Sequence, residues 1–208
     1  MDFLLGGNLS LIIFFPLVGI PLIIFVSYLY NNAEGPMKTA ALIVTVIEFL
    51  ISIPLFTSFQ AGYPGMQFVT KIPWIESLGV SYHVGVDGIS LLLVLLTTFI
   101  IPITILSAWH AIHKAMREFL IMTLIIESAM IGTFLALDMI LFFVFWEAVL
   151  IPMYFIIGIW GTERRIYAAI KFFIYTAFGS ALMLIAIFYL FFAHLQQFGA
   201  PSMDVLEF

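Results

Sequence analysis

Six long apolar runs constrain this chain more than any other feature. Each run is close to the length of about 20 apolar residues that a helix needs to cross the hydrocarbon core of a bilayer. Open chain segments inside lipid satisfy their backbone groups only as helices. The expected helices are residues 9–30, 38–58, 89–109, 118–137, 139–160 and 166–192. The sequence therefore predicts an all-α, polytopic membrane protein with about six transmembrane helices, in which residues 1–208 form a single membrane domain.

The composition excludes several other classes of protein. Of the 208 residues, 64% are hydrophobic and 9% are charged, whereas a soluble domain has about 25% charged residues. The chain has no cysteine, which excludes disulfides and thiolate-bound iron–sulfur clusters. A net charge of −5 argues against a nucleic-acid partner, which requires a basic face. The first apolar run follows an acid and no base, so we expect a retained helix and not a cleaved signal peptide.

The lysines and arginines predict the orientation in the membrane. With six helices, the connecting loops alternate between the two sides. One side receives only Lys71, and the other receives Lys38, Lys114, Arg117, Arg164, Arg165 and Lys171. Cytoplasmic loops carry the excess of positive charge, so we expect the second side to face the cytoplasm and both termini to lie outside.

The connections carry local signals as well. The long external connection, residues 59–88, contains two stretches rich in β-branched and aromatic residues and could form a short hairpin, with Pro73 on an edge strand. Asp87 suits the N-cap of the next helix, with Ser90 three residues further on. Only Asp138 separates the fourth and fifth expected helices, so the turn between them must be tight.

Three glutamates fall near the middle of the expected helices, namely Glu48, Glu127 and Glu147. An intramembrane carboxylate costs about 2.5 kcal/mol or more on insertion scales and usually faces the protein interior. Burial favours the protonated carboxyl, and a nearby cation favours the ionised one. A carboxyl under both influences can take up and release a proton, so these residues are candidates for a proton relay.

Lys171, Glu127 and Glu147 form a series of increasing depth. At a rise of about 1.5 Å per residue from the cytoplasmic ends of their helices, Lys171 lies about 8 Å deep, Glu127 about 14 Å and Glu147 about 20 Å. Helix axes about 8–10 Å apart allow water or side-chain rotation to connect such groups. We therefore predict a stepped proton route inward from the cytoplasmic face. Pro152 loosens the backbone beside Glu147 because it removes the hydrogen bond to the carbonyl of Ala148.

Structural roles stay open for each of these residues. A permanently protonated carboxyl, hydrogen-bonded to a neighbouring helix, is the alternative for Glu127 and Glu147. It is the favoured interpretation for Glu48, because no matching base accompanies Glu48 in its helix. Lys171 lies near a helix end and could extend to the membrane interface. Three embedded carboxylates face only one shallow base, so we expect a deeper base from another polypeptide or from a longer chain.

Three stretches of the sequence resemble a known family. They are FFVFWEAVLIPMYFIIGIWG, KFFIYTAFGSALMLIAI and GVDGISLLLVLLTTFIIPI. They resemble the antiporter-like membrane subunits of respiratory complex I, and FWEAVLIPMY is the most specific piece. The resemblance implies a central proton-translocating role for Glu147 and a matching conserved glutamate at Glu127. It also implies a fold of about fourteen helices in two inverted repeats, of which these six form the first part, and a partner lysine on a later helix.

The resemblance implies a proton-translocating subunit in the membrane arm of NADH:quinone oxidoreductase, driven by quinone reduction elsewhere in the complex. It implies no cofactor in this chain, with NADH, flavin, iron–sulfur clusters and quinone bound by partner subunits. The implied partners are the other membrane-arm subunits and the lipid bilayer, in a bacterial inner membrane. Two other functions stay open: a subunit of a multisubunit sodium/proton antiporter, which shares the fold, and a structural membrane anchor without a transport role.

Overall fold

The computed structural model describes residues 8–208 and contains six long helices and one small hairpin. All six helices are long and apolar enough to cross a membrane, so the prediction of six membrane spans is confirmed. In chain order the elements are α2 (Leu9–Leu29), α3 (Glu34–Ser58), β1 (Gln67–Ile75), η1 (Glu76–Leu78), β2 (Val80–Val86), α4 (Gly88–Ala108), α5 (Met116–Leu135), α6 (Met139–Trp160), α7 (Arg165–Phe198) and η2 (Val205–Glu207).

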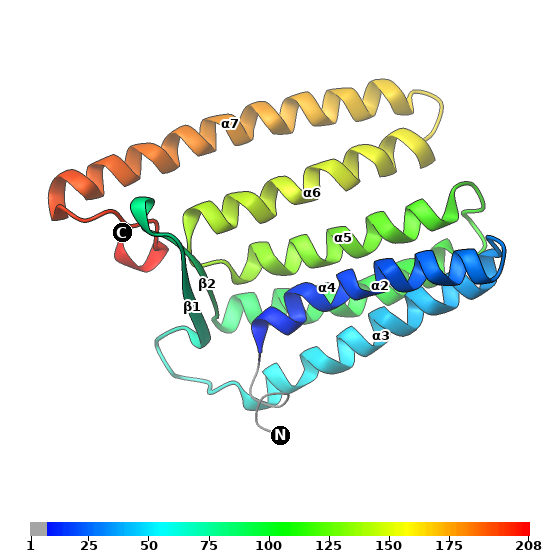
Figure 1. Ribbon diagram of the computed structural model, residues 1–208, viewed down its shortest axis with the longest axis horizontal. Coiled ribbons are helices and arrows are strands. Elements are labelled where there is room, and N and C mark those ends of the chain that lie inside the picture. The colour runs from blue at the N-terminus through cyan, green and yellow to red at the C-terminus, as the bar shows by residue number, and fades with distance from the viewer. Residues whose placement is uncertain (1–7) are drawn as a thin grey trace.

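The helices are arranged unevenly around α5. Figure 1 shows α2, α3, α4 and α5 as a bundle, with α6 beside α5 and α7 at the outer edge beside α6. In its most apolar stretch α5 has 56% of its residues buried, whereas α7 has 17%. Side chains of α5 are therefore enclosed by protein on most sides, and α7 presents most of its surface outward.

Two helices are longer than their apolar runs. Helix α3 begins at Glu34, four residues before the expected start at residue 38, because an acid in the first turn suits the helix dipole and Pro36 is tolerated there. Helix α7 continues to Phe198, six residues past the expected end at residue 192. Gly199, the first glycine after the apolar run, caps the helix with a left-handed φ of 73°.

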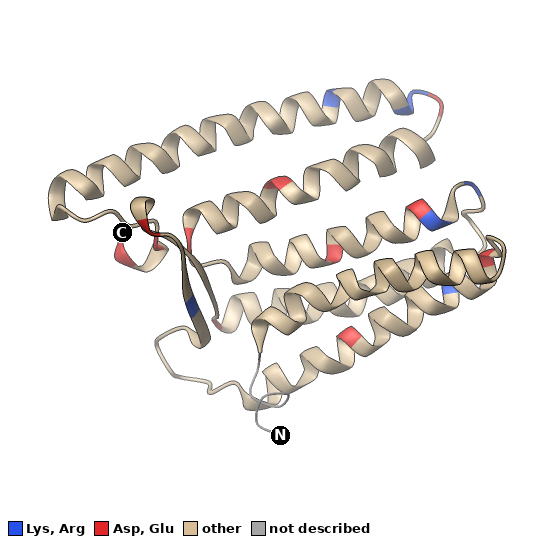
Figure 2. Cartoon of the chain, in the orientation of Figure 1, with Lys and Arg blue, Asp and Glu red and all other residues tan. Residues whose placement is uncertain are grey.

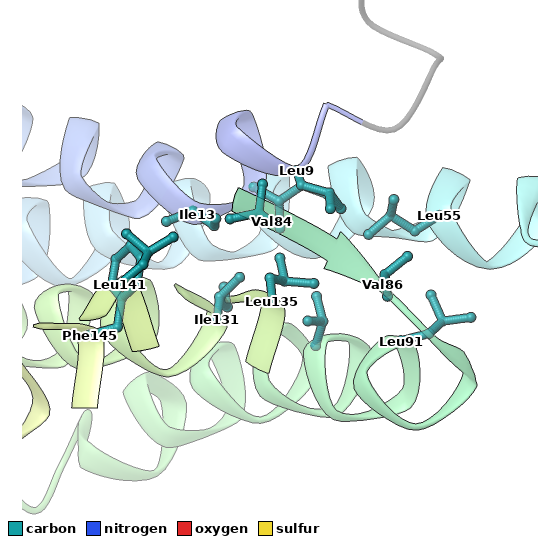
Figure 3. Packing of buried hydrophobic residues seen from close by; sticks show 12 residues of the cluster. Leu9, Ile13, Leu55, Val84, Val86, Leu91, Ile131, Leu135, Leu141 and Phe145 are labelled. Carbon is teal, nitrogen blue, oxygen red and sulfur yellow. The ribbon is translucent and has the colours of Figure 1, made fainter. Parts of the chain in front are cut away.

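The hairpin crosses one end of the bundle. Strands β1 and β2 pair antiparallel, with Lys71 opposite His83 and a register shift between Pro73 and Ile75. Strand β1 is mostly exposed and β2 is almost entirely buried. Figure 3 shows the buried side of β2 against the helix ends, in a cluster that includes Leu9, Val84, Val86, Leu91 and Leu135.

Two aspartates begin helices beside this hairpin. Asp87 caps α4 and exchanges hydrogen bonds with Ser90, as predicted. Asp138 caps α6, since its Oδ1 accepts hydrogen bonds from the backbone N–H groups of Ile140 (2.9 Å) and Leu141 (3.1 Å). Its Oδ2 accepts another from the N–H of Ser81 at 2.8 Å. Burial raises the pKa of Asp138 and outweighs these hydrogen bonds, which lower it.

The C-terminal tail fastens the far end of α7 to the hairpin. The Lys71 ammonium donates to Asp204 Oδ2 at 2.6 Å, and this bond raises the pKa of Lys71. His83 Nδ1 lies 3.0 Å from the same oxygen, without the alignment of a hydrogen bond. Figure 2 shows that Lys and Arg otherwise gather toward the opposite end of the molecule. The six-to-one distribution of positive charge thus corresponds to the two ends of the bundle.

Candidate proton-transfer site

The turn between α5 and α6 places Glu127 and Glu147 on neighbouring antiparallel helices. The two helices approach closely because Gly132 has no side chain: a Cβ there would lie 2.4 Å from Cδ1 of Phe145. Asp138 holds the turn by capping α6. Both glutamates lie well inside their helices, and Figure 2 shows acidic positions in the interior of α5 and of α6.

The two glutamates differ in burial but share a lack of partners. Glu127 is 0% exposed, and neither of its carboxyl oxygens has a hydrogen-bond partner among residues 8–208. Glu147 is partly buried, and its Oε1 is likewise enclosed without a partner in that range. A carboxylate that is ionised and unpaired in an apolar interior is very costly. Carboxyls placed in this way on intramembrane helices are therefore candidates for a functional role.

Glu48 of α3 is a third buried carboxyl of the same kind. It is 0% exposed, and within residues 8–208 both of its oxygens are buried without a partner. One turn before it, Val44 of α3 meets Leu124 of α5: a Cβ built at Gly19 of α2 would lie 3.0 Å from Val44 Cγ1 and 2.6 Å from Leu124 Cδ1. Glu48 follows Val44 by four residues and Glu127 follows Leu124 by three, so both carboxyls lie about one turn beyond this contact. The structure therefore brings Glu48 and Glu127 together.

Lys171 lies apart from these carboxyls. Its side chain is exposed on α7, and its Nζ is 5.9 Å from the centre of the Tyr167 ring. None of the ion pairs formed within the described part of the chain includes Lys171. The predicted route from Lys171 to Glu127 and Glu147 thus requires water or another chain to connect its first step.

An apolar crevice of about 520 Å³ opens between α5, α6 and α7. Its wall includes Ile126, next to Glu127, and Trp146, next to Glu147. The indole N–H of Trp146 donates to the hydroxyl of Ser180 at 3.3 Å and so connects α6 to α7. Neither carboxyl lines the crevice itself, so a proton reaches either of them from there only through water or side-chain rotation. Pro152 interrupts the backbone hydrogen bonds of α6 in the same part of the helix.

Sequence reasoning assigned Glu48 a structural role, although a signal was present. Lys38, Thr45, Glu48 and Ser52 follow one another at intervals of 7, 3 and 4 residues, which places them on one face of a helix. All four are buried in the structure. A polar stripe on an intramembrane helix faces protein and not lipid. Reading α3 by periodicity would therefore have grouped Glu48 with the interior carboxyls.

Comparison with known proteins identifies relatives of this chain. Residues 136–196 match the family model described as NADH:quinone oxidoreductase/Mrp antiporter, TM. The chain is 50% identical over 183 residues to NADH-quinone oxidoreductase subunit M of Rhodobacter capsulatus, which covers 86% of this chain and 34% of that protein. It is a homologue of the antiporter-like membrane subunits. A second homologue, NADH-ubiquinone oxidoreductase chain 4 of Arabidopsis thaliana, is 40% identical over 200 residues, or 96% of this chain and 39% of that one.

The fold agrees with that of a solved antiporter-like subunit. A chain of respiratory complex I from Thermus thermophilus with bound NADH matches with a TM-score of 0.76 and 25% identity, over 96% of this chain and 38% of that chain. The resemblance predicted from FWEAVLIPMY is confirmed by these matches. This chain thus spans between 34% and 39% of the length of the homologues described here.

Proposed function

We propose that this chain serves as a proton-translocating part of the membrane arm of NADH:quinone oxidoreductase, with Glu127 and Glu147 as proton carriers. The observation that supports it most is the burial of Glu127, whose two oxygens are enclosed at 0% exposure with no partner among residues 8–208. A membrane protein bears this cost at a residue that exchanges protons. The relationship to NADH-quinone oxidoreductase subunit M supports the choice of complex.

In this proposal the proton moves between neutral and ionised carboxyls. A proton on Glu127 passes, through water in the crevice region or by side-chain rotation, to an ionised Glu147 on the neighbouring helix. Lys171, exposed on α7, stands at the cytoplasmic end of the route and stabilises the ionised state of groups that approach it. Quinone reduction in partner subunits supplies the energy, and the redox groups bind to those subunits. The chain then lies in a bacterial inner membrane with both termini outside.

The energy source separates this function from that of a sodium/proton antiporter, which the matching family model also includes. The experiment uses inverted membrane vesicles that contain the chain in its assembled complex. The proposal predicts proton uptake when NADH is added and quinone is present, and none when only a sodium gradient is imposed. Uptake that follows the sodium gradient and ignores NADH would support the antiporter instead.

A further inference from the structure

One face of α3 carries a buried polar stripe that leads from one end of the bundle to its centre. At the end, Lys38 is 4% exposed, and its ammonium donates to Glu34 and to the carbonyl oxygen of Trp109, both at 2.8 Å. Glu48 lies ten residues further along α3, or about 15 Å at the rise of an α-helix. Thr45 lies between them, at 0% exposure. The stripe therefore connects a charged end of the bundle with the carboxyl at its centre.

Glu48 differs from the other polar groups of this stripe in its hydrogen bonding. Thr45 donates to carbonyl oxygens of its own helix, those of Ala41 and Leu42. Ser52 bonds to the carbonyl of Phe49 and to the hydroxyl of Thr98, at 2.7 and 2.9 Å. A buried polar group that serves only packing is normally satisfied in this way. Glu48 has no such partner among residues 8–208, so its carboxyl contributes no hydrogen bond that would explain its presence.

Among the titratable side chains around Glu48, the equally buried Glu127 is the one that lies inside the bundle with it. Helices α2, α4 and α5 enclose this face of α3. The only titratable side chain of α2 is Tyr28, and α4 has none. Helix α5 supplies Arg117 and Glu118, which pair with each other in an exposed position at its start, and Glu127. On α3 itself the other titratable groups are the paired Glu34 and Lys38. Glu127 is thus the one titratable group beside Glu48 in the centre of the described bundle.

We propose that Glu48 is a further proton-transfer residue, which forms with Glu127 a carboxyl pair that holds one proton. The proposal rests on the proposed function and extends it to a residue on α3. Two ionised carboxylates side by side in an apolar interior repel each other, and two groups that interact this strongly titrate as a unit. Because no hydrogen bond joins the two carboxyls, the transfer step needs a side-chain rotation or a bridging water; the O–H bond of one carboxylic acid then breaks and an O–H bond forms on the neighbouring carboxylate. The pair keeps one negative charge throughout.

The pair gives the route a second entrance. The predicted series begins at Lys171 on α7, at the outer edge of the molecule. The stripe of α3 reaches Glu127 from the opposite side, through the interior of the bundle and past Thr45. In this arrangement Glu48 receives a proton from the Lys38 end and passes it to Glu127. Glu127 then delivers the proton toward Glu147.

The test is a double-mutant cycle on NADH-driven proton uptake by the assembled complex in vesicles. The variants are Glu48→Gln, Glu127→Gln, both together, and Glu48→Asp. Protons taken up per quinone reduced are measured over a range of pH, and each rate is expressed per assembled complex. We expect each Gln variant to lose most of the coupled uptake, and the double variant to lose no more than the worse single one, because the two residues act as one unit. Glu48→Asp keeps a titratable group and retains uptake.

Ser52→Ala is the matched control, because Ser52 lies on the same buried face beyond Glu48, outside the segment from Lys38 to Glu48, and its replacement leaves both carboxyls in place. It is expected to take up protons as the parent does. The proposal is overturned if Glu48→Gln pumps like the parent, if Gln and Asp at residue 48 have the same effect, or if the losses of the single variants multiply in the double variant. A parallel Glu147→Gln variant separates the two proposals. If uptake survives that change, the proposed function fails; if it is lost while Glu48→Gln pumps normally, only the pair fails.

Discussion

Glu48 and Glu127 present four buried oxygens without a partner among residues 8–208, while hydroxyl groups close by are satisfied. Thr123, one turn before Glu127, donates to the carbonyl of Phe119 at 2.9 Å. Ser128, next to Glu127, donates to the carbonyl of Ile13 at 2.6 Å. Hydroxyls on intramembrane helices can use backbone acceptors in this way, and carboxylates cannot, because the helix has already used its N–H groups. This difference explains why the two buried carboxyls lack partners while the buried hydroxyls beside them do not.

At the hairpin end of the bundle, the titration of Asp204 affects the stability of the fold. Its partial burial favours the protonated acid, but the hydrogen bonds from Lys71 and from the N–H of Leu206, together with the charge of Lys71, outweigh burial and lower the pKa of Asp204. Because the pKa is lower in the folded chain than in the unfolded one, the ion pair stabilises the fold above the usual carboxyl pKa. This stabilisation is lost as the pH falls through the lowered value.

We therefore expect Asp204→Asn to destabilise the fold near neutral pH by about 1–3 kcal/mol, the net contribution of a partly buried hydrogen bond between charged groups. The loss of stability toward acid pH should also become shallower. Thermal unfolding of the purified protein in detergent, measured from neutral to acid pH, tests both effects. Glu207→Gln is the control, because Glu207 is exposed and lies 3.9 Å from Lys71. An unchanged acid limb in Asp204→Asn would contradict this account of the ion pair.

At the scale of the elements, the contact between α5 and α6 depends on Gly132. An alanine there would place its Cβ 2.4 Å from Cδ1 of Phe145, so the aromatic ring must move. We expect Gly132→Ala to destabilise the fold by about 1–3 kcal/mol, as overpacking does. Gly179→Ala makes the same change in α7, where nothing lies within 4 Å of the new Cβ. Denaturant unfolding of both variants tests the prediction, and equal stability would show that α5 and α6 are less tightly packed.

The start of α6 gives a second prediction at this scale. Asp138→Ala removes the N-cap of α6 and leaves the buried N–H of Ser81 without its acceptor. Loss of a cap of this type costs about 0.5–2 kcal/mol, and the unpaired N–H adds to it. Asp138→Asn keeps an acceptor for the cap and should be less destabilised. The order parent, Asn and Ala in thermal unfolding supports this role; an Ala variant as stable as the parent contradicts it.

The elements also show how far sequence reasoning reaches. The apolar runs predicted all six membrane helices, and Asp87 with Ser90 marked the start of α4, because these signals are local. The pairing of Lys71 with Asp204 joins residues 133 positions apart, and no local pattern indicates it. The proximity of Glu48 to Glu127 was missed for a similar reason. It depends on how α3 is rotated against α5, which the polar stripe indicates only when the whole helix is considered.

At the scale of the whole molecule, the uneven burial of the helices is the main feature. Helix α7 has 34 residues, or about 51 Å of helix, which exceeds a hydrocarbon core of about 30 Å. It also has the smallest buried share of the six helices. Its outer surface is therefore available to lipid and to other membrane subunits, as a place in a membrane arm requires.

The orientation in the membrane follows from the two ends of the bundle and can be tested directly. Because the chain has no cysteine, single cysteines report accessibility without background from this chain. Glu163 lies in the exposed turn between α6 and α7, and Ser77 lies in the exposed hairpin; the two variants are Glu163→Cys and Ser77→Cys. We expect a membrane-impermeant thiol reagent to label residue 163 from the cytoplasmic side and residue 77 from the outside. Labelling with the sides exchanged would reverse the proposed orientation.

The central claim is that a carboxyl inside the bundle carries protons, and Glu147→Gln tests it most directly. NADH-driven proton uptake into vesicles is measured together with quinone reduction and with the amount of assembled complex. The account predicts a complex that assembles normally but loses coupled proton uptake and coupled turnover. Normal uptake at normal assembly would contradict it and would leave Glu147 with a structural role, as in a membrane anchor.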